Sequence, residues 1–169
     1  MVTPSRKLMD EHDSILIGLD ILEKMTVLIQ DGKQVEINDI EEMLNFLKLF
    51  ADKSHHGKEE DILFPAMEKA GIPNERGPIG QMLIEHNQGR VYIKEMGESI
   101  QEGNLAKNEF IQAAINYINL LRAHIKKENM VLFPMGDKMI PADEQEEISV
   151  RFKEWEENIL GAENLAKMH

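Results

Sequence analysis

The chain has 169 residues, of which 42% are hydrophobic and 30% charged, as expected for one globular domain with its own core. Its 31 acidic residues outnumber 19 basic ones, and the formal charge of -12 argues against nucleic acid and anionic membrane surfaces as partners. Because there is no cysteine, any metal site must use nitrogen and oxygen ligands. No apolar run approaches the ~20 residues of a membrane span, so we expect a cytoplasmic protein.

The first half of the chain predicts two long helices. Apolar residues recur at helical spacing from Leu8 to Thr26, and the Asp-Gly pair at residues 31–32 is a helix-stop signal. A second helix is predicted to begin at the capping pair of residues 38–39 and to be disturbed at Phe64-Pro65. Both helices carry an apolar face, which predicts that they pack against other helices.

The second half predicts two more long helices and a shorter one. Pro78 suits the first turn of a third helix and Gly103 its end, and a fourth helix follows from about Leu105 to residues 133–134. The acidic segment DEQEE and the apolar residues after it predict a shorter fifth helix that covers the bundle.

No strand-like alternation is convincing anywhere, so the sequence predicts an all-α fold. We expect an up-down-up-down four-helix bundle over residues 1–137, because short connections favour antiparallel neighbours. Residues 138–169 are expected to add a short C-terminal helix that packs on the bundle within one domain. His169 is expected to be a mobile terminal residue.

An internal repeat is the most informative feature of the sequence. HHGKEEDILFP at residues 55–65 and HIKKENMVLFP at residues 124–134 match at His, Lys, Glu, Leu, Phe and Pro. A His and a Glu four residues apart lie about 6 Å along a helix axis and about 40° around it, so both face one ion. The second copy supplies the pair His124 and Glu128.

The first copy of the repeat is ambiguous, because His55 with Glu59 and His56 with Glu60 have the same spacing. Alignment with the second copy selects His55 and Glu59. Counting back in α-helical steps supports this, since the steps from His55 reach apolar residues and those from His56 reach mostly charged ones. We therefore expect His56 and Glu60 to be solvated neighbours of the site.

Four histidines are predicted to meet inside the bundle. His12 and His86 lie near the starts of the first and third helices, and His55 and His124 lie late in the second and fourth. In an up-down bundle these positions converge at one end. Buried imidazoles and carboxylates are costly without compensation, and a pair of cations offsets that cost. The donor set suits iron or manganese, and zinc remains chemically possible.

These residues resemble the hemerythrin-like, or HHE cation-binding, family. The resemblance covers roughly residues 8 to 135 and rests on EHD in the first helix, the two HxxxE elements that lead into LFP, and EHNQGR in the third helix. It implies a non-haem centre of two iron ions with an oxo or hydroxo bridge, rather than manganese or zinc. The implied terminal ligands are His12, His55, His86 and His124, and the implied bridging carboxylates are Glu59 and Glu128.

The sequence departs from the oxygen-carrying hemerythrins at two positions. Those proteins place a second ligand histidine in the third helix, where this chain has Arg90, and usually an aspartate where this chain has Glu128. With four histidines, the ions should keep more exchangeable positions than an oxygen carrier permits, which favours reactivity over reversible carriage. The pattern is more distantly similar to the di-iron domain of iron–sulfur cluster repair proteins. Because those proteins generally carry an additional cysteine-bearing segment, we do not expect a repair role.

The expected function is that of a di-iron protein that binds or reduces a small oxidant such as dioxygen, peroxide or nitric oxide. If it is an enzyme, it is an oxidoreductase acting on one of these molecules. The alternative is a non-catalytic iron or oxygen sensor, or an iron-binding module, whose readout is a protein partner. Tyr117, two turns before His124 on the same face, is either a hydrogen-bond donor or redox-active phenol near the metals, or a core residue.

Overall fold

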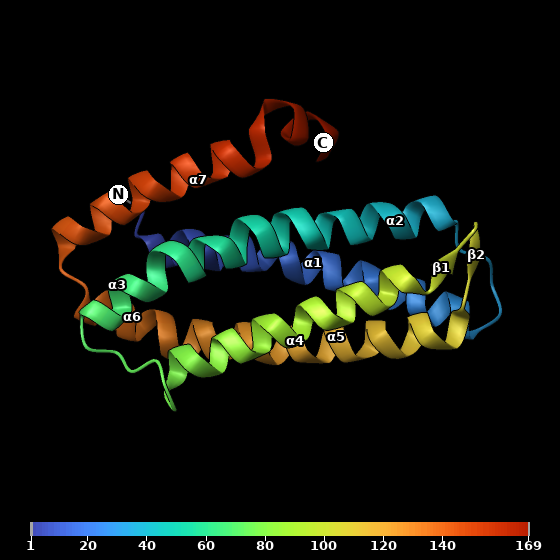
Figure 1. The fold of residues 1–169 in the computed structure, drawn as a ribbon, viewed down its shortest axis with the longest axis horizontal. Helices are drawn as coiled ribbons and strands as arrows, with labels where there is room; N and C mark the ends of the chain where they lie inside the picture. The colour runs from blue at the N-terminus through green and yellow to red at the C-terminus, as the bar shows by residue number, and fades with distance from the viewer. Residues whose placement is uncertain (1, 169) are drawn as a thin grey trace.

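The computed structural model describes residues 2–168, with side chains up to Gly161, as a set of long helices joined by short connections (Figure 1). His169 lies outside the described residues. In chain order the elements are α1 (Pro4–Gln30), α2 (Ile37–Phe46), the π-helical segments η1 (Leu47–His56) and η2 (Glu59–Leu63), α3 (Phe64–Lys69), α4 (Pro78–Glu98), β1 (Ile100–Gln101), β2 (Asn104–Leu105), α5 (Lys107–Lys127), the π-helical η3 (Glu128–Leu132), α6 (Phe133–Met139) and α7 (Ala142–Met168). The expectation of an all-α fold is confirmed.

Four helical runs lie lengthwise side by side. They are α1, α2 with its continuation through η1 and η2 into α3, α4, and α5 with its continuation through η3 into α6 (Figure 1). The chain turns back after each run, and α5 packs along both α1 and α4. Among residues 2–168, no helix is both long and apolar enough to cross a membrane.

The apolar core is divided into two clusters. One contains Ile15, Leu47 and Tyr117 among others, and the second contains Leu8 and Phe133 among others. The predicted inward histidines occur near the border between these clusters. This arrangement leaves a buried polar band across the bundle, flanked by apolar side chains on both sides.

From the glutamate onward, both copies of the sequence repeat have the same local structure. In each copy a π-helical segment begins at the glutamate, at Glu59 and at Glu128, and a short α-helix begins at the Phe-Pro pair. Proline lacks a backbone N–H and its ring collides with the carbonyl one α-helical turn earlier, so a change of helical pitch is expected just ahead of it. Pro65 and Pro134 therefore do not end their helical runs, which continue through α3 and α6.

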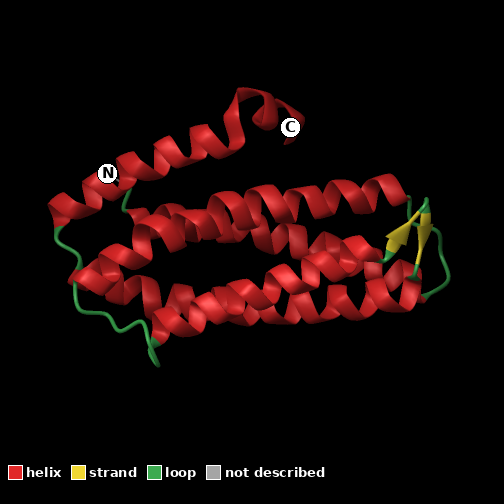
Figure 2. Ribbon diagram, in the orientation of Figure 1, coloured by secondary structure: helices red, strands yellow, loops and turns green. Residues whose placement is uncertain are grey.

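The end of the third helix differs from the prediction. The helix ends at Glu98 rather than at Gly103, and residues 100–105 form an antiparallel hairpin of two-residue strands (Figure 2). Its turn contains Glu102 and Gly103, both with positive φ. Strands this short contain no detectable alternation, so the sequence pattern missed them.

The C-terminal helix is also longer than predicted. α7 spans 27 residues, as many as α1, with one non-helical residue inside it at Gly161. It lies against α1 and the π-helical part of the second run (Figure 1). Ile148 and Phe152 bury its inner face in the second apolar cluster. α7 is therefore packed on the half of the bundle that carries the polar band.

Leu19→Ala should destabilise the fold much more than a similar truncation on the surface of the same helix. Leu19 is fully buried, so the cavity and lost transfer energy should lower the free energy of unfolding by about 2–5 kcal/mol. Ile17, which is 61% exposed, supplies the matched control Ile17→Ala, expected to change stability by less than about 0.5 kcal/mol. Urea denaturation measures both, and equal losses would contradict the assignment of the core.

Candidate metal centre

All six predicted site residues lie together in the buried polar band. They come from the four helical runs, and each has at most 1% of its surface exposed: His12 in α1, His55 in η1, Glu59 in η2, His86 in α4, His124 in α5 and Glu128 in η3. Their convergence is the arrangement that the helix directions and the repeat predicted.

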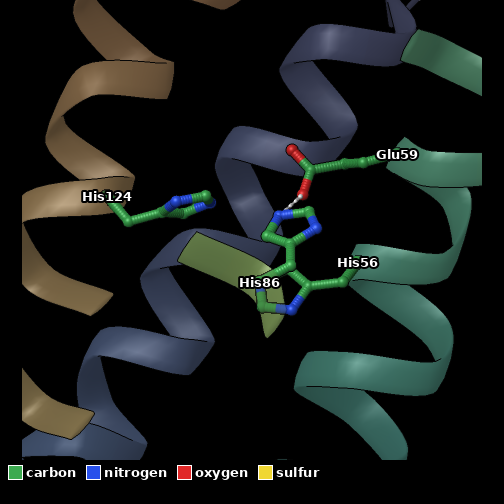
Figure 3. Close-up of side chains that lie close together, drawn as sticks. All are labelled: His56, Glu59, His86 and His124. Atoms are coloured by element: carbon green, nitrogen blue, oxygen red, sulfur yellow. Dashed lines mark ion pairs between the residues drawn. The ribbon is translucent and has the colours of Figure 1, made fainter. Parts of the chain in front are cut away.

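Glu59 lies between imidazoles of two different helical runs. Its Oε1 atom is 3.2 Å from Nε2 of His86 and 3.8 Å from Nε2 of His55. Figure 3 shows the Glu59 carboxylate paired with His86, with the ring of His124 directed toward the same space. This carboxylate faces the inside of the cluster rather than solvent.

Glu128 occupies the equivalent position in the second copy of the repeat. Its Oε1 atom is 3.1 Å from Nε2 of His12 and 3.2 Å from Nε2 of His124. The two glutamates of the repeat thus each stand between two histidines, which is the placement that a carboxylate shared by two ions needs.

Several inner atoms of the cluster form no hydrogen bond with any group of the described residues. A buried polar atom without a partner costs about 1–3 kcal/mol, so a group of them in one place needs an explanation. These atoms are Nε2 of His55, His86 and His124, both carboxylate oxygens of Glu59, and Oε2 of Glu128. All of them are metal-ligand atoms, and the residues therefore fit a bound cation.

The potential ligand atoms form two groups, in each of which all atoms lie within 4.8 Å of one another. Metal bonds of about 2.0–2.2 Å place opposite ligands about 4.4 Å apart, so each group can close on one ion after a small adjustment. Glu59 belongs to both groups. The first group is His12, His55, Glu59 and Glu128, and the second is His56, Glu59, His86 and His124.

His56 is not a solvated neighbour, and the prediction made for it was wrong. The side chain is buried, and its ring stacks on that of His86 with centroids 3.9 Å apart and planes at 18° (Figure 3). The error arises from the helix type, since residues 47–56 are π-helical and place more residues in each turn than an α-helix. Counting in α-helical steps therefore rotates His56 away from its true position. The adjacent His-His pair was the signal that could have identified it.

The fifth imidazole changes the comparison with oxygen carriers. Arg90 stands where those proteins have a ligand histidine, but His56 supplies an imidazole from the neighbouring run. The expectation of more open metal positions was based on a count of four histidine ligands. With five imidazoles in the cluster, the number of ligands no longer supports it.

Each of the five histidines also bonds outward through Nδ1. Such bonds fix the tautomer and orientation of a ligand imidazole and leave Nε2 for the metal. The pairs are His12 with Asn129 at 2.7 Å, His55 with Glu11 at 2.9 Å, His56 with Asp52 at 3.3 Å, His86 with Glu60 at 2.7 Å and His124 with Glu85 at 2.9 Å. Glu60, also expected to be a solvated neighbour, is thus a hydrogen-bond partner of His86.

The outer carboxylates are in turn paired with cationic side chains. These pairs hold the carboxylates in place and offset the negative charge around the cluster. They are Arg90 with Asp52 and Glu60, Lys127 with Glu85, and Lys58 with Glu11. Sequence reasoning assigned none of these outer residues its pairing role, because the cations and carboxylates come from different helices. The signal that could have found some of them is that Lys58 and Lys127 are the matching lysines of the repeat, and that Glu11 and Glu85 directly precede His12 and His86.

Burial and charge set the protonation of the inner groups. Burial lowers the pKa of His55 to about 4 and of His86 to about 3, so both are neutral at pH 7, the form that binds metals. His124 differs: burial opposes its positive charge, but the negative charge of Glu128 and the hydrogen-bonded carboxylate of Glu85 raise its pKa to about 9. Burial and the charge of Glu128 raise the pKa of Glu59 well above its usual range.

Tyr117 is buried in the first apolar cluster, against Gly89 of α4. Its hydroxyl has no hydrogen-bond partner among the described residues, so it makes no such bond to a histidine or glutamate of the cluster. Burial and the charge of Asp52 raise its pKa, so the phenol stays protonated. A role for Tyr117 near the metals stays a prediction.

The helical fold and the buried cluster of histidines and glutamates define an all-α metal-binding protein. The family model described as Hemerythrin HHE cation binding domain matches residues 3–136. Because this match covers most of the chain, the protein belongs to the hemerythrin HHE cation-binding family. The resemblance noted from the sequence motifs is confirmed. The match extends from α1 into α6 and leaves α7 outside.

Glu59→Gln should stabilise the metal-free protein. The pKa of Glu59 is raised on folding, so its cost to stability begins above the unfolded value near pH ~4.3 and grows as the pH rises toward the folded pKa. Glutamine removes this cost. In the presence of a chelator, the gain in melting temperature over the native chain should be larger at pH 8 than at pH 5.

The exposed Glu41 of α2 provides the control, because Glu41→Gln removes the same charge away from the cluster. A gain for Glu59→Gln that is independent of pH, or equal to that of the control, would contradict the raised pKa.

Proposed function

We propose that this protein is a non-haem di-iron protein that binds or reduces a small oxidant such as dioxygen, peroxide or nitric oxide. The proposal places the iron pair within a hemerythrin-like up-down-up-down four-helix bundle. The observation that carries it is the group of buried nitrogen and oxygen atoms inside the bundle that form no hydrogen bond within the described part of the chain. Except for Nε2 of His86, these atoms belong to the two copies of one sequence repeat, so each copy contributes a histidine and a glutamate, as a two-ion site requires.

The proposed ligands divide between two ions that share the glutamates. His12 and His55 would serve one ion, and His56, His86 and His124 the other, with Glu59 and Glu128 as the carboxylates between them. When bound, the iron pair would supply electrons and Lewis-acid positions for the oxidant. Imidazole and carboxylate donors suit iron better than calcium or magnesium, and we propose iron rather than manganese or zinc.

The surroundings of the cluster favour a small molecule as the ligand of the metals. The inner residues are almost completely buried, which leaves no room for a large substrate. A surface pocket of about 540 Å³ is lined in part by Asp52 and Arg90. Asp52 also bonds His56, and Arg90 also pairs with Glu60, so the pocket lies directly outside the second ion group. We propose this side as the approach of the oxidant.

Metal analysis tests the proposal most directly. Protein loaded aerobically with iron should hold two irons per chain, absorb visible light and lose both ions in His124→Ala and Glu59→Ala. At free iron 100-fold above Kd, each bound ion should add about 2.7 kcal/mol to the stability of the folded chain. Glu41→Ala, outside the site, should retain both irons. Full iron retention in both site variants would sink the proposal.

His56→Ala tests the ligand that the structure added. If His56 binds the second ion, the variant should hold less iron and show a shifted visible spectrum. If His56 only stacks on His86, iron content and spectrum should match those of the native chain, because Nε2 of His86 would keep its place. Iron determination and absorption spectroscopy on the same samples decide between these outcomes.

A second candidate function is a non-catalytic iron or oxygen sensor read by a partner. The observation that favours it is the contact of α7 with the helix segment that carries His55 and His56. Consumption of peroxide or nitric oxide faster than by free iron supports the oxidoreductase. A metal-dependent change in α7 without such turnover supports the sensor.

A further inference from the structure

α7 docks directly on the backbone next to the proposed ligands of the second helical run. The indole Nε1 of Trp155 donates a hydrogen bond of 3.0 Å to the carbonyl oxygen of Lys53. The same ring covers Gly57, where an added Cβ would lie 2.7 Å from Cζ2 of Trp155. Because any side chain at residue 57 would collide with the indole, the absence of one is what permits this close contact. Gly57 lies between His55 and Glu59 in the sequence, and Lys53 lies two residues before His55.

Lys58 links α7 to the site electrostatically. Its side chain is completely buried, 2.5 Å from Oε2 of Glu11 and 2.6 Å from Oε1 of Glu156, and 5.5 Å from the centre of the Phe152 ring. A buried ammonium is strongly destabilising unless it is well paired. Two of these three groups, Glu156 and Phe152, belong to α7. The environment of Lys58 is therefore complete only while α7 is docked.

Glu11 connects Lys58 to a proposed ligand. While one oxygen of Glu11 accepts from Lys58, the other accepts from Nδ1 of His55 at 2.9 Å. Burial opposes the charge of Glu11, but the hydrogen bond from His55 and the charge of Lys58 lower its pKa to about 2. A continuous series of polar contacts thus runs from Glu156 of α7 through Lys58 and Glu11 to His55.

Within the described part of the chain, the other outer partners are not linked to α7 through their cations, as Glu11 is through Lys58. Among the described residues, the cations that pair with the outer partners of His56, His86 and His124 lie on α4 and α5. The family match also stops before α7. His55 is therefore the proposed ligand whose support depends on an element outside the matched domain.

We propose that Lys58 and Glu156 are positioning residues, through which the docked α7 holds His55 in its metal-binding orientation. The proposal rests on the proposed metal site and concerns its regulation. Coupling between two sites is reciprocal, so docked α7 strengthens metal binding and bound metal strengthens the docking of α7 on the bundle. A partner that takes up α7 would release the metal, and loss of the metal would expose α7 to a partner.

The first test compares Glu156→Ala with Glu157→Ala in the full chain. Glu157 is exposed on the same helix, so its substitution removes the same charge without touching Lys58. Outer-sphere partners typically change metal affinity 10- to 100-fold, and Glu156 acts through Glu11, so we expect iron transfer to a chelator to accelerate about tenfold. Glu157→Ala should transfer iron at the native rate. Trp155→Ala, which weakens docking by a different contact, should accelerate transfer in the same direction.

The second test measures hydrogen–deuterium exchange of the α7 backbone between residues 148 and 160, with and without iron. Metal should slow this exchange in the native chain and in Glu157→Ala, and the slowing should be lost in Glu156→Ala. Equal exchange with and without iron, or equal transfer rates in all variants, would overturn the proposal while leaving the metal site intact. A native chain that binds no iron would overturn the proposed function as well.

Discussion

A band of imidazoles and carboxylates in the interior of the bundle is the constraint on which the rest of the structure depends. In a medium of low polarity these groups cannot be left without partners, and hydrophobic residues of the same volume would make a more stable core. In this protein the polar groups are arranged in three successive layers. Nε2 atoms and the oxygens of Glu59 and Glu128 face inward, Nδ1 atoms bond outward to carboxylates and an amide, and cations hold those carboxylates. Each layer restricts the motion of the one inside it.

These layers also explain the role of the charged side chains near the site. Although acidic residues exceed basic ones by a wide margin, Lys58, Arg90 and Lys127 are all committed to carboxylates that touch the histidines. Lys58 is buried completely for this purpose, an unusual environment for lysine. Acidic side chains near the site are therefore structural parts of the cluster as well as a source of net charge.

The sequence contained enough information for the fold class and the six central residues, because both depend on regular patterns. Apolar spacing identified the long helices, and the repeat placed His55 and Glu59 in the predicted cluster. His56 escaped because the helix around it is π-helical, so the α-helical period used to judge it does not apply. The β1–β2 hairpin escaped because its strands are too short to alternate. The roles of Glu11, Glu60 and Glu85 as hydrogen-bond partners of the histidines were not predicted. Each bonds a histidine of another helix, and such contacts do not follow from spacing along the chain.

The π-helical segments have a consequence for how the chain can vary in length. A π-helical turn contains one residue more than the α-helical turn that would replace it. Both copies of the repeat place a proline ten positions after the histidine, at 55 and 65 and at 124 and 134, with such a segment between them. Loss of one residue there would turn every later side chain by about 100° around the helix axis. The number of residues between histidine and proline therefore fixes the orientation of the side chains that follow. We expect substitutions within this interval to be accommodated far more readily than insertions or deletions.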